Sequence, residues 1–247
     1  MSWERLPPEL IEGIFDYLQQ DKRVLKACSL VCKAWLYPAY RRLFYDTRLS
    51  WDRLRIAFDP RSKSTAAPFI RRLHLWYDSI RAWNEISPSL DGFHSVTSLS
   101  IAQLRWDDSE VRLAISNRFI AIVRLELQIV LTTTFSELAQ MICTFRCLEK
   151  LIIGITACIV LDKASPLLCL PQHLHALELD GPNSTEIVEW LSSFGQDLTL
   201  RNVCFWNFHH HHYQVINTLL RVLGPSLESF RMCLGGALLH LLFSIVV

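Results

Sequence analysis

The chain contains eight cysteines, which could serve in a metal site or in catalysis, because a thiolate can bind a metal or act as a nucleophile. Two pairs, Cys28 with Cys32 and Cys143 with Cys147, are four residues apart, which is the spacing of one helix face and not of a CxxC metal site. We therefore expect reduced, buried thiols that pack as small core side chains. The other four are Cys158, Cys169, Cys204 and Cys233.

Histidines and carboxylates form two further clusters. Residues 209–212 are four consecutive histidines, which lack the fixed spacing of a structural metal site, so we expect a solvated loop. The acidic run WDDSE at residues 106–110 is better suited to capping a helix than to catalysis. The sequence contains no GxGxxG, P-loop or GxSxG motif. We expect no catalytic centre, no metal and no cofactor, and we do not expect an enzyme.

The composition is that of a packed protein with little net charge. Apolar residues make up 51% of the 247 residues and the formal net charge is +1, which argues against disorder and against nucleic acid as a partner. The first residues show no charged region followed by an apolar run, so we expect no secretory signal. The apolar tail at residues 234–247 is shorter than the roughly 20 residues that span a bilayer, so we interpret it as a packed element. We expect a cytoplasmic or nuclear protein that binds no membrane.

The elements that must position any site begin with the segment LPPELIEGIFDYL, residues 6–18. Pro8 suits the first turn of a helix, where the missing N–H of proline costs nothing. Apolar residues recur at helical spacing from Leu10 to Leu18 and form a broad stripe. The sequence therefore predicts an amphipathic helix close to the N-terminus.

A second helix, or a pair of helices, is predicted over the apolar residues between positions 24 and 36, with Asp21 as the N-cap. Pro38 predicts a break or a kink, and residues 40–46 end the unit. A helical unit of about 40 residues buries little core by itself, so its apolar residues predict a partner surface.

The two segments together, LPPELIEGIFDYL and ACSLVCKAW (residues 27–35), closely resemble the F-box motif over about residues 5–45. The Leu-Pro-x-Glu-Leu start, the Ile-Phe-x-x-Leu continuation and the Val-Cys-x-x-Trp end occur in the right order. The resemblance implies a three-helix unit that docks the Skp-type adaptor of cullin–RING (SCF-type) ubiquitin ligases.

Carried over by position, the resemblance implies adaptor contacts at Leu6, Pro7, Pro8, Ile11, Ile14, Phe15, Leu18, Val31 and Trp35. The alternative for each of these side chains is the internal core of the unit. We favour partner contact for the Leu-Pro-Pro start and the core for Trp35.

The remainder of the chain is repetitive. Six segments of the form apolar-x-x-apolar-x-apolar begin 26 residues apart and a seventh follows after 27, starting at residues 70, 96, 122, 148, 174, 200 and 227. Apolar residues two positions apart lie on one side of a strand, and the long returns allow parallel pairing. The returns at residues 136–145, 184–194 and 213–224 predict helices, whereas the repeat at residues 151–176 predicts a loop.

This pattern resembles the leucine-rich repeat over about residues 69–233. The resemblance implies an α/β fold: a small three-helix unit followed by a solenoid of parallel strands with helical or loop returns and a period of about 26. The Asn or Cys that the family places after the last strand leucine is missing, so we expect an irregular solenoid. We place the F-box-like unit at residues 1–45 and the solenoid at residues 46–247, beginning with a strand and helix near Thr47.

Strand residues that alternate with the buried leucines face the open side of the sheet, which is the surface that solenoids use for binding. This reasoning predicts target contacts at Arg72, His74, Trp76, Arg124, Glu126, Lys150, Glu178, Asp180, Trp206 and Arg231. The alternative is an ordinary solvated face.

The sequence therefore predicts a substrate-recognition subunit of an SCF-type ubiquitin ligase, with a Skp-type adaptor and an unknown target protein as partners. Two alternatives remain. One is a non-catalytic interaction scaffold without ubiquitin transfer, and the other is a hydrolase-like enzyme with an unrecognised centre.

Overall fold

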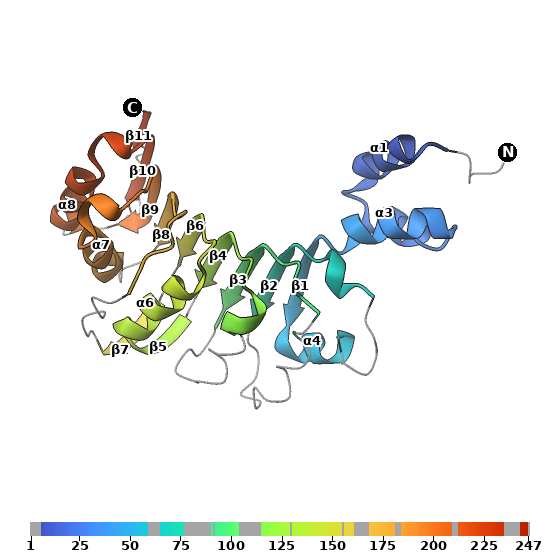
Figure 1. Cartoon of the computed structure of the whole chain (residues 1–247), viewed down its shortest axis with the longest axis horizontal. Helices are drawn as coiled ribbons and strands as arrows, with labels where there is room; N and C mark the ends of the chain where they lie inside the picture. The colour runs from blue at the N-terminus through green and yellow to red at the C-terminus, as the bar shows by residue number, and fades with distance from the viewer. Residues whose placement is uncertain are drawn as a thin grey trace.

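The computed structural model describes residues 6–58, 65–76, 90, 92–103, 115–128, 130–154, 156–160, 168–180, 184–208, 212–234 and 243–246. Helices open the chain, and a long row of strands follows with further helices between them (Figure 1). The first helices lie at one end of this row and the last helices lie at the other (Figure 1). Among the described helices, none combines the length and apolarity needed to cross a bilayer.

Three helices form the N-terminal unit: α1 (Pro8–Leu18), α2 (Lys22–Cys28) and α3 (Lys33–Leu43). Pro8 occupies the first turn of α1. Asp21 is the N-cap of α2, where its carboxylate accepts hydrogen bonds from the backbone N–H groups of Arg23 and Val24 at 2.9 and 3.1 Å. The predicted proline and cap positions are therefore confirmed.

Of the break or kink predicted at Pro38, the break does not occur, because α3 continues through this residue. Pro38 and the following Ala39 are buried, so packing of the helix against its neighbours offsets the backbone hydrogen bond that a proline removes. Arg42 Nη1 also donates to the Pro38 carbonyl at 3.2 Å, which gives that carbonyl a side-chain donor.

The described strands form a nine-stranded sheet in the order β1-β2-β3-β4-β6-β8-β9-β10-β11. The parallel strands are β1 (Asp46–Ser50), β2 (Arg72–Trp76), β3 (Ser98–Ala102), β4 (Arg124–Gln128), β6 (Lys150–Ile153), β8 (Ala176–Asp180), β9 (Asn202–Phe208) and β10 (Ser229–Leu234). At the C-terminal edge, β11 (Phe243–Val246) pairs antiparallel with β10. The sheet therefore contains a strand at each predicted segment, and residues of the apolar tail form its last strand.

The register of the sheet aligns the apolar positions of successive strands. The row that starts at Leu73 continues through Leu99, Leu125, Leu151, Leu177, Val203 and Phe230. These side chains are buried in one continuous core. Residues between them point to the opposite side of the sheet, because successive side chains of a strand alternate. One side is therefore a core face and the other is open.

Helices and turns cover the core face between the strands. The α-helices are α4 (Trp51–Ala57), α6 (Phe135–Thr144), α7 (Ser184–Ser192) and α8 (Tyr213–Leu223). The short 3-10 helices are η3 (Ala67–Phe69), η6 (Gly195–Asp197) and η8 (Gly224–Ser226). Thr134 and Glu137 form a reciprocal capping box at the start of α6. At the end of α8, Gly224 adopts a φ of 47°, a conformation that suits glycine. The predicted helices are thus present, and so are the strand and helix near Thr47.

A second, two-stranded parallel sheet was not predicted. It pairs β5 (Val130–Thr134) with β7 (Thr156–Val160). The loop predicted over this part of the repeat at residues 151–176 is therefore wrong for residues 156–160. The reason is that Thr156–Val160 pairs in parallel with Val130–Thr134, the segment 26 positions earlier, and β-branched residues in both segments favour a strand.

The cysteine predictions are partly wrong. Cys28 ends α2 and Cys32 is the N-cap of α3, so this pair does not share a helix face. Cys147 lies beyond the end of α6. Cys28, Cys204 and Cys233 are buried as expected, but Cys147 and Cys169 are exposed. These two occupy connecting segments, where spacing along a helix carries no information about burial.

The predicted polar clusters fall largely outside the described residues: this applies to residues 106–110 and to histidines 209–211. His212 is described, and it is buried at the start of α8. A solvated position is therefore wrong for this histidine. Within the described ranges, no group of three or more His, Cys, Asp or Glu side chains is arranged to hold a metal ion.

Candidate functional site

The N-terminal unit has its own small core. It consists of Ile11, Phe15, Leu25, Cys28, Ala39 and Leu43. Trp35 packs its ring edge-to-face on Phe15 with centroids 5.6 Å apart. Leu6, Leu18 and Trp35 are half-buried against the same core. The structure thus places Ile11 and Phe15, which were predicted as adaptor contacts, inside the unit, where their role is to shape its surface.

Other predicted contact residues are available to a partner. Pro7 and Pro8 are exposed, as are Ile14 at 39% and Val31 at 56% of their surface. Further large apolar residues of the unit are also exposed, although motif reasoning missed them: Leu10, Tyr17, Leu30, Leu36 and Tyr37. A helical-wheel separation of the first helix could have found part of this set. Leu10, Ile14 and Tyr17 follow at i, i+4 and i+7, so they form a stripe distinct from that of Ile11, Phe15 and Leu18.

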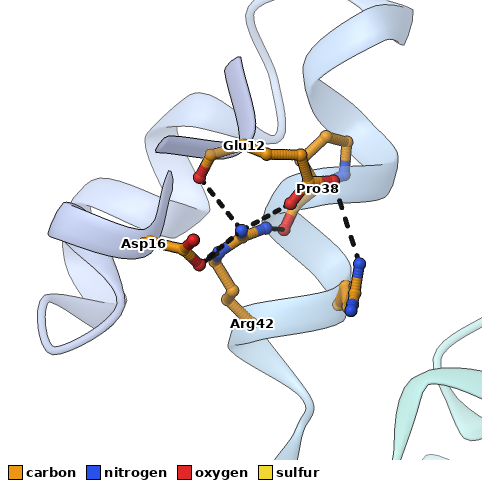
Figure 2. Close-up of polar contacts among 5 residues, drawn as sticks. Glu12, Asp16, Pro38 and Arg42 are labelled. Carbon is orange, nitrogen blue, oxygen red and sulfur yellow. Dashed lines mark hydrogen bonds and ion pairs between the residues drawn. The ribbon is translucent and has the colours of Figure 1, made fainter. Parts of the chain in front are cut away.

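An arginine holds α1 against α3 (Figure 2). Arg42 Nη2 donates to the Glu12 carboxylate at 2.5 Å, to the Glu12 carbonyl at 3.0 Å and to Asp16 Oδ1 at 2.6 Å. Its guanidinium also lies 5.8 Å from the centre of the Phe15 ring. Burial lowers the pKa of Arg42, but hydrogen bonds to Glu12 and Asp16 raise it, and the net change is upward. Arg42 therefore adds a polar link between α1 and α3 to the apolar core that these helices share.

Aromatic rings join the N-terminal unit to the sheet. Tyr37 and Tyr40 of α3 contact Phe69 of η3 at centroid distances of 5.1 and 5.9 Å. Tyr40 also stacks edge-on against Phe44 at 5.2 Å, and Phe44 packs against both hydrophobic cores. The joint is thus a packed contact and not only a chain connection, so the orientation of the unit relative to the sheet is set by side chains.

The residues predicted for target binding lie on strands of the open side. Arg72, Trp206 and Arg231 are exposed, and the remaining seven are half-buried. Several of these are paired: His74 Nε2 lies 3.3 Å from Asp46, Arg124 lies 3.8 Å from Glu126, and Lys150 forms an ion pair with Glu178. Ion pairs thus lie on the open face at two places, within β4 and between β6 and β8, and a His–Asp contact joins β2 to β1.

Three of the predicted residues share one hollow of about 380 Å³. Its lining consists of Gln128, Ile152, Ile153, Gly154, Glu178, Leu179, Asp180 and Trp206. Glu178, Asp180 and Trp206 therefore belong together, whereas the other predicted target residues do not line this hollow. Gln128, Ile152 and Gly154 were not among the predicted contacts. Alternation along the strands does place Gln128 and Ile152 on the open side, but no sequence signal marks Gly154 as part of the lining.

Cys204 lies on the open side of β9 by position but is buried. Burial, followed by the nearby charge of Glu178, raises the pKa of its thiol to about 11. The thiol is thus held in its neutral form at neutral pH, in which it is a poor nucleophile and a poor metal ligand.

Comparison with known families identifies the N-terminal unit. Residues 3–54 match the F-box-like family model, so the chain contains an F-box-like domain. F-box domains typically bind Skp-type adaptors within SCF complexes. The match covers α1 to α3, β1 and part of α4. No significant match to a curated protein was found. The resemblance of the repeats to leucine-rich repeats and the boundary placed at residue 45 remain predictions.

Proposed function

We propose that this protein is a substrate-recognition subunit of an SCF-type cullin–RING ubiquitin ligase. Its F-box-like domain docks the Skp-type adaptor, and its open sheet face holds a target protein. The observation that carries the proposal is the combination of the F-box-like match at residues 3–54 with apolar side chains exposed on the same unit.

The exposed apolar residues support adaptor docking. Leu10 and Ile14 lie on the outer side of α1, and Val31 lies in the connection between α2 and α3. Apolar side chains that gather on a small unit mark a contact surface, because exposing them to water costs free energy that a partner recovers. We assign adaptor contact to these residues and to Pro7 and Pro8, and core roles to Ile11 and Phe15.

We assign target binding to the nine-stranded sheet and its helices, which we interpret as a leucine-rich-repeat-like solenoid. Consistent with such a solenoid, Leu73 pairs with Leu99, Leu99 with Leu125 and Leu125 with Leu151. Repeats of this kind present a long open face whose residues vary freely while the core row is kept. The packed aromatic joint would hold that face at a defined orientation to the adaptor.

In this proposal the chain itself performs no chemistry and requires no cofactor. It raises the effective concentration of the target beside a ubiquitin-transfer enzyme that other subunits supply. The proposed location is the cytoplasm or the nucleus, where reduced thiols persist. A scaffold that binds the adaptor without ubiquitin transfer is the alternative function.

Calorimetric titration of the full chain with purified Skp-type adaptor tests the docking role. We expect the wild type to bind and Ile14→Glu to weaken binding at least about tenfold, because a carboxylate would be desolvated in an apolar contact. The matched control is Ile120→Glu, since Ile120 is also exposed but lies outside the F-box-like domain. It should bind as the wild type does.

The proposal fails if the folded wild type gives no heat with the adaptor, or if both variants bind equally well. Binding followed by a lack of ubiquitin transfer to any captured protein, in a complete ligase, would favour the scaffold.

A further inference from the structure

The hollow on the open face combines an aromatic ring with a carboxylate. Asp180 of β8 and Trp206 of β9 are register partners on adjacent parallel strands. Both line the hollow, and 39% of the Trp206 surface is exposed. Side chains of register partners on the same side of a sheet stand next to one another. A ligand in the hollow can therefore touch the indole face and the carboxylate together.

The two carboxylates that line the hollow, those of Glu178 and Asp180, differ in their partners. Glu178 forms an ion pair with Lys150, and Glu126 of β4 lies 3.8 Å from Arg124 of the same strand. Asp180 instead accepts a hydrogen bond of 2.7 Å from the amide of Asn207, which carries no charge. Of the two carboxylates that line the hollow, Asp180 is therefore the one without a cationic partner among the described residues, and Arg231 stands beside Cys204 on the adjacent strand β10.

The backbone supports this arrangement. Asn207 has a φ of 56°, in the left-handed region that asparagine tolerates better than most residues. Its amide is thereby brought onto Asp180, and it holds the carboxylate in place beside the indole. On the other side of the hollow, Gly154 leaves space: a Cβ at this position would lie 3.5 Å from the Leu127 carbonyl oxygen and 3.6 Å from Gln128 Cγ, which are ordinary contact distances.

We infer that this hollow binds an arginine side chain presented by an extended segment of the target protein. A guanidinium stacks on an indole face and pairs with a carboxylate, whereas its methylene groups would pack on Ile152. The hollow is near the lower end of the roughly 300 to 1,000 Å³ that ligand pockets occupy, so it suits one side chain and not a folded domain. This inference rests on the proposed function in that the arginine belongs to the target.

Degenerate peptide pools with one fixed central residue test the inference on the full chain without adaptor. The probes are pools fixed as arginine, citrulline, lysine, glutamate or phenylalanine, each carrying a fluorophore for anisotropy. Citrulline keeps the shape of arginine and removes its charge. We expect the arginine pool to bind about tenfold more tightly than the citrulline pool, because one charge-assisted pair and a cation–π contact are lost together.

Two variants and one control complete the design. Asp180→Asn should remove the difference between the arginine and citrulline pools, and Gly154→Leu should weaken the arginine pool by filling the hollow without changing charge. The control is Asp197→Asn, the same substitution at an exposed residue of η6 outside the hollow. It should bind the pools as the wild type does.

Equal binding of the arginine and citrulline pools by the wild type would overturn the inference, and so would a preference for the phenylalanine, glutamate or lysine pool. Arginine selectivity that survives both variants would also overturn it. Adaptor titration of the same preparations separates the two claims. Arginine selectivity without adaptor binding leaves this inference standing and removes the ligase, whereas adaptor binding without selectivity does the reverse.

Discussion

One carboxylate oxygen of Asp16 in α1 accepts two hydrogen bonds from Arg42 in α3, which lies 26 positions further along the chain. Arg42 Nε donates to Asp16 Oδ1 at 3.1 Å, and Arg42 Nη2 donates to the same oxygen at 2.6 Å. The Arg42 side chain is only 10% exposed, and Figure 2 shows its guanidinium between Asp16 and Glu12. The relationship ties α1 to α3, so the exposed residues of α1 keep a fixed position relative to the rest of the F-box-like domain.

The first prediction concerns this arginine. Arg42→Met keeps much of the aliphatic stem and removes the charged donor that the Glu12 carbonyl and the Glu12 and Asp16 carboxylates share. We expect the free energy of opening α1 to fall by about 1 to 3 kcal/mol. Hydrogen exchange of the α1 amides measures this change as faster exchange.

Arg41→Met is the matched control for this experiment. The Arg41 side chain is 61% exposed and approaches Glu12 only at 3.9 Å, so its loss should change exchange by less than about 0.5 kcal/mol. Equal effects of the two substitutions would contradict a special role for Arg42.

The second prediction concerns the joint between the F-box-like domain and the sheet. Phe69→Ala removes a ring that contacts both Tyr37 and Tyr40. We expect a loss of about 1 to 3 kcal/mol in the free energy that holds the joint, which is less than for a fully buried phenylalanine because Phe69 is half-buried. Small-angle scattering should show a wider range of domain orientations. A scattering profile identical to the wild type would indicate that the joint is held elsewhere.

The third prediction concerns the reactivity of two cysteines at the end of α6. Burial, and then the neighbouring Cys169, raises the pKa of Cys143 to about 12 from an ordinary 9.0. At pH 8 this shift lowers the thiolate fraction of Cys143 about a thousandfold. Alkylation by iodoacetamide, resolved by mass spectrometry, should therefore modify exposed Cys147 long before Cys143. Similar rates at both positions would contradict the burial of Cys143.

The same shift has a consequence for stability at alkaline pH. Below pH 9 both the folded and the unfolded chain keep the Cys143 proton, so Cys143 contributes no pH dependence to the free energy of unfolding in that range. Between pH 9 and about 12 the unfolded chain loses the proton and the folded chain retains it, so stability falls as pH rises. A Cys143→Ala variant should show a smaller alkaline loss of stability than the wild type, as measured by urea unfolding at a series of pH values.

Much of the fold could be predicted because apolar residues two positions apart indicate which side chains lie on the same side of a strand. Leu73 and Leu75 are two positions apart and both are buried, and this alternation recurs along the sheet. The helix does not break at Pro38, because packing of α3 overrides the local preference of proline. The pairing of β5 with β7 was also missed, since neither strand carries the leucine spacing.

The candidate sites were less predictable. The motif identifies the F-box-like domain, but Leu10, Ile11, Ile14 and Phe15 are all apolar, so it does not state which of them face the core. Only packing separates Ile11 and Phe15 from the two exposed residues. The hollow depends on the left-handed backbone of Asn207 and on the missing side chain of Gly154. These are properties of the folded backbone that no periodicity reveals.

The central claim is the proposal that this chain joins an SCF-type ligase by docking the Skp-type adaptor through its F-box-like domain. The most direct test is to mix the full chain with purified Skp-type adaptor and cullin–RING subunits and to measure the mass of the eluting complex by light scattering. The account predicts one assembly that contains all components and that Ile14→Glu removes the chain from it. A folded wild-type chain that elutes alone, separate from adaptor and cullin, would contradict the account.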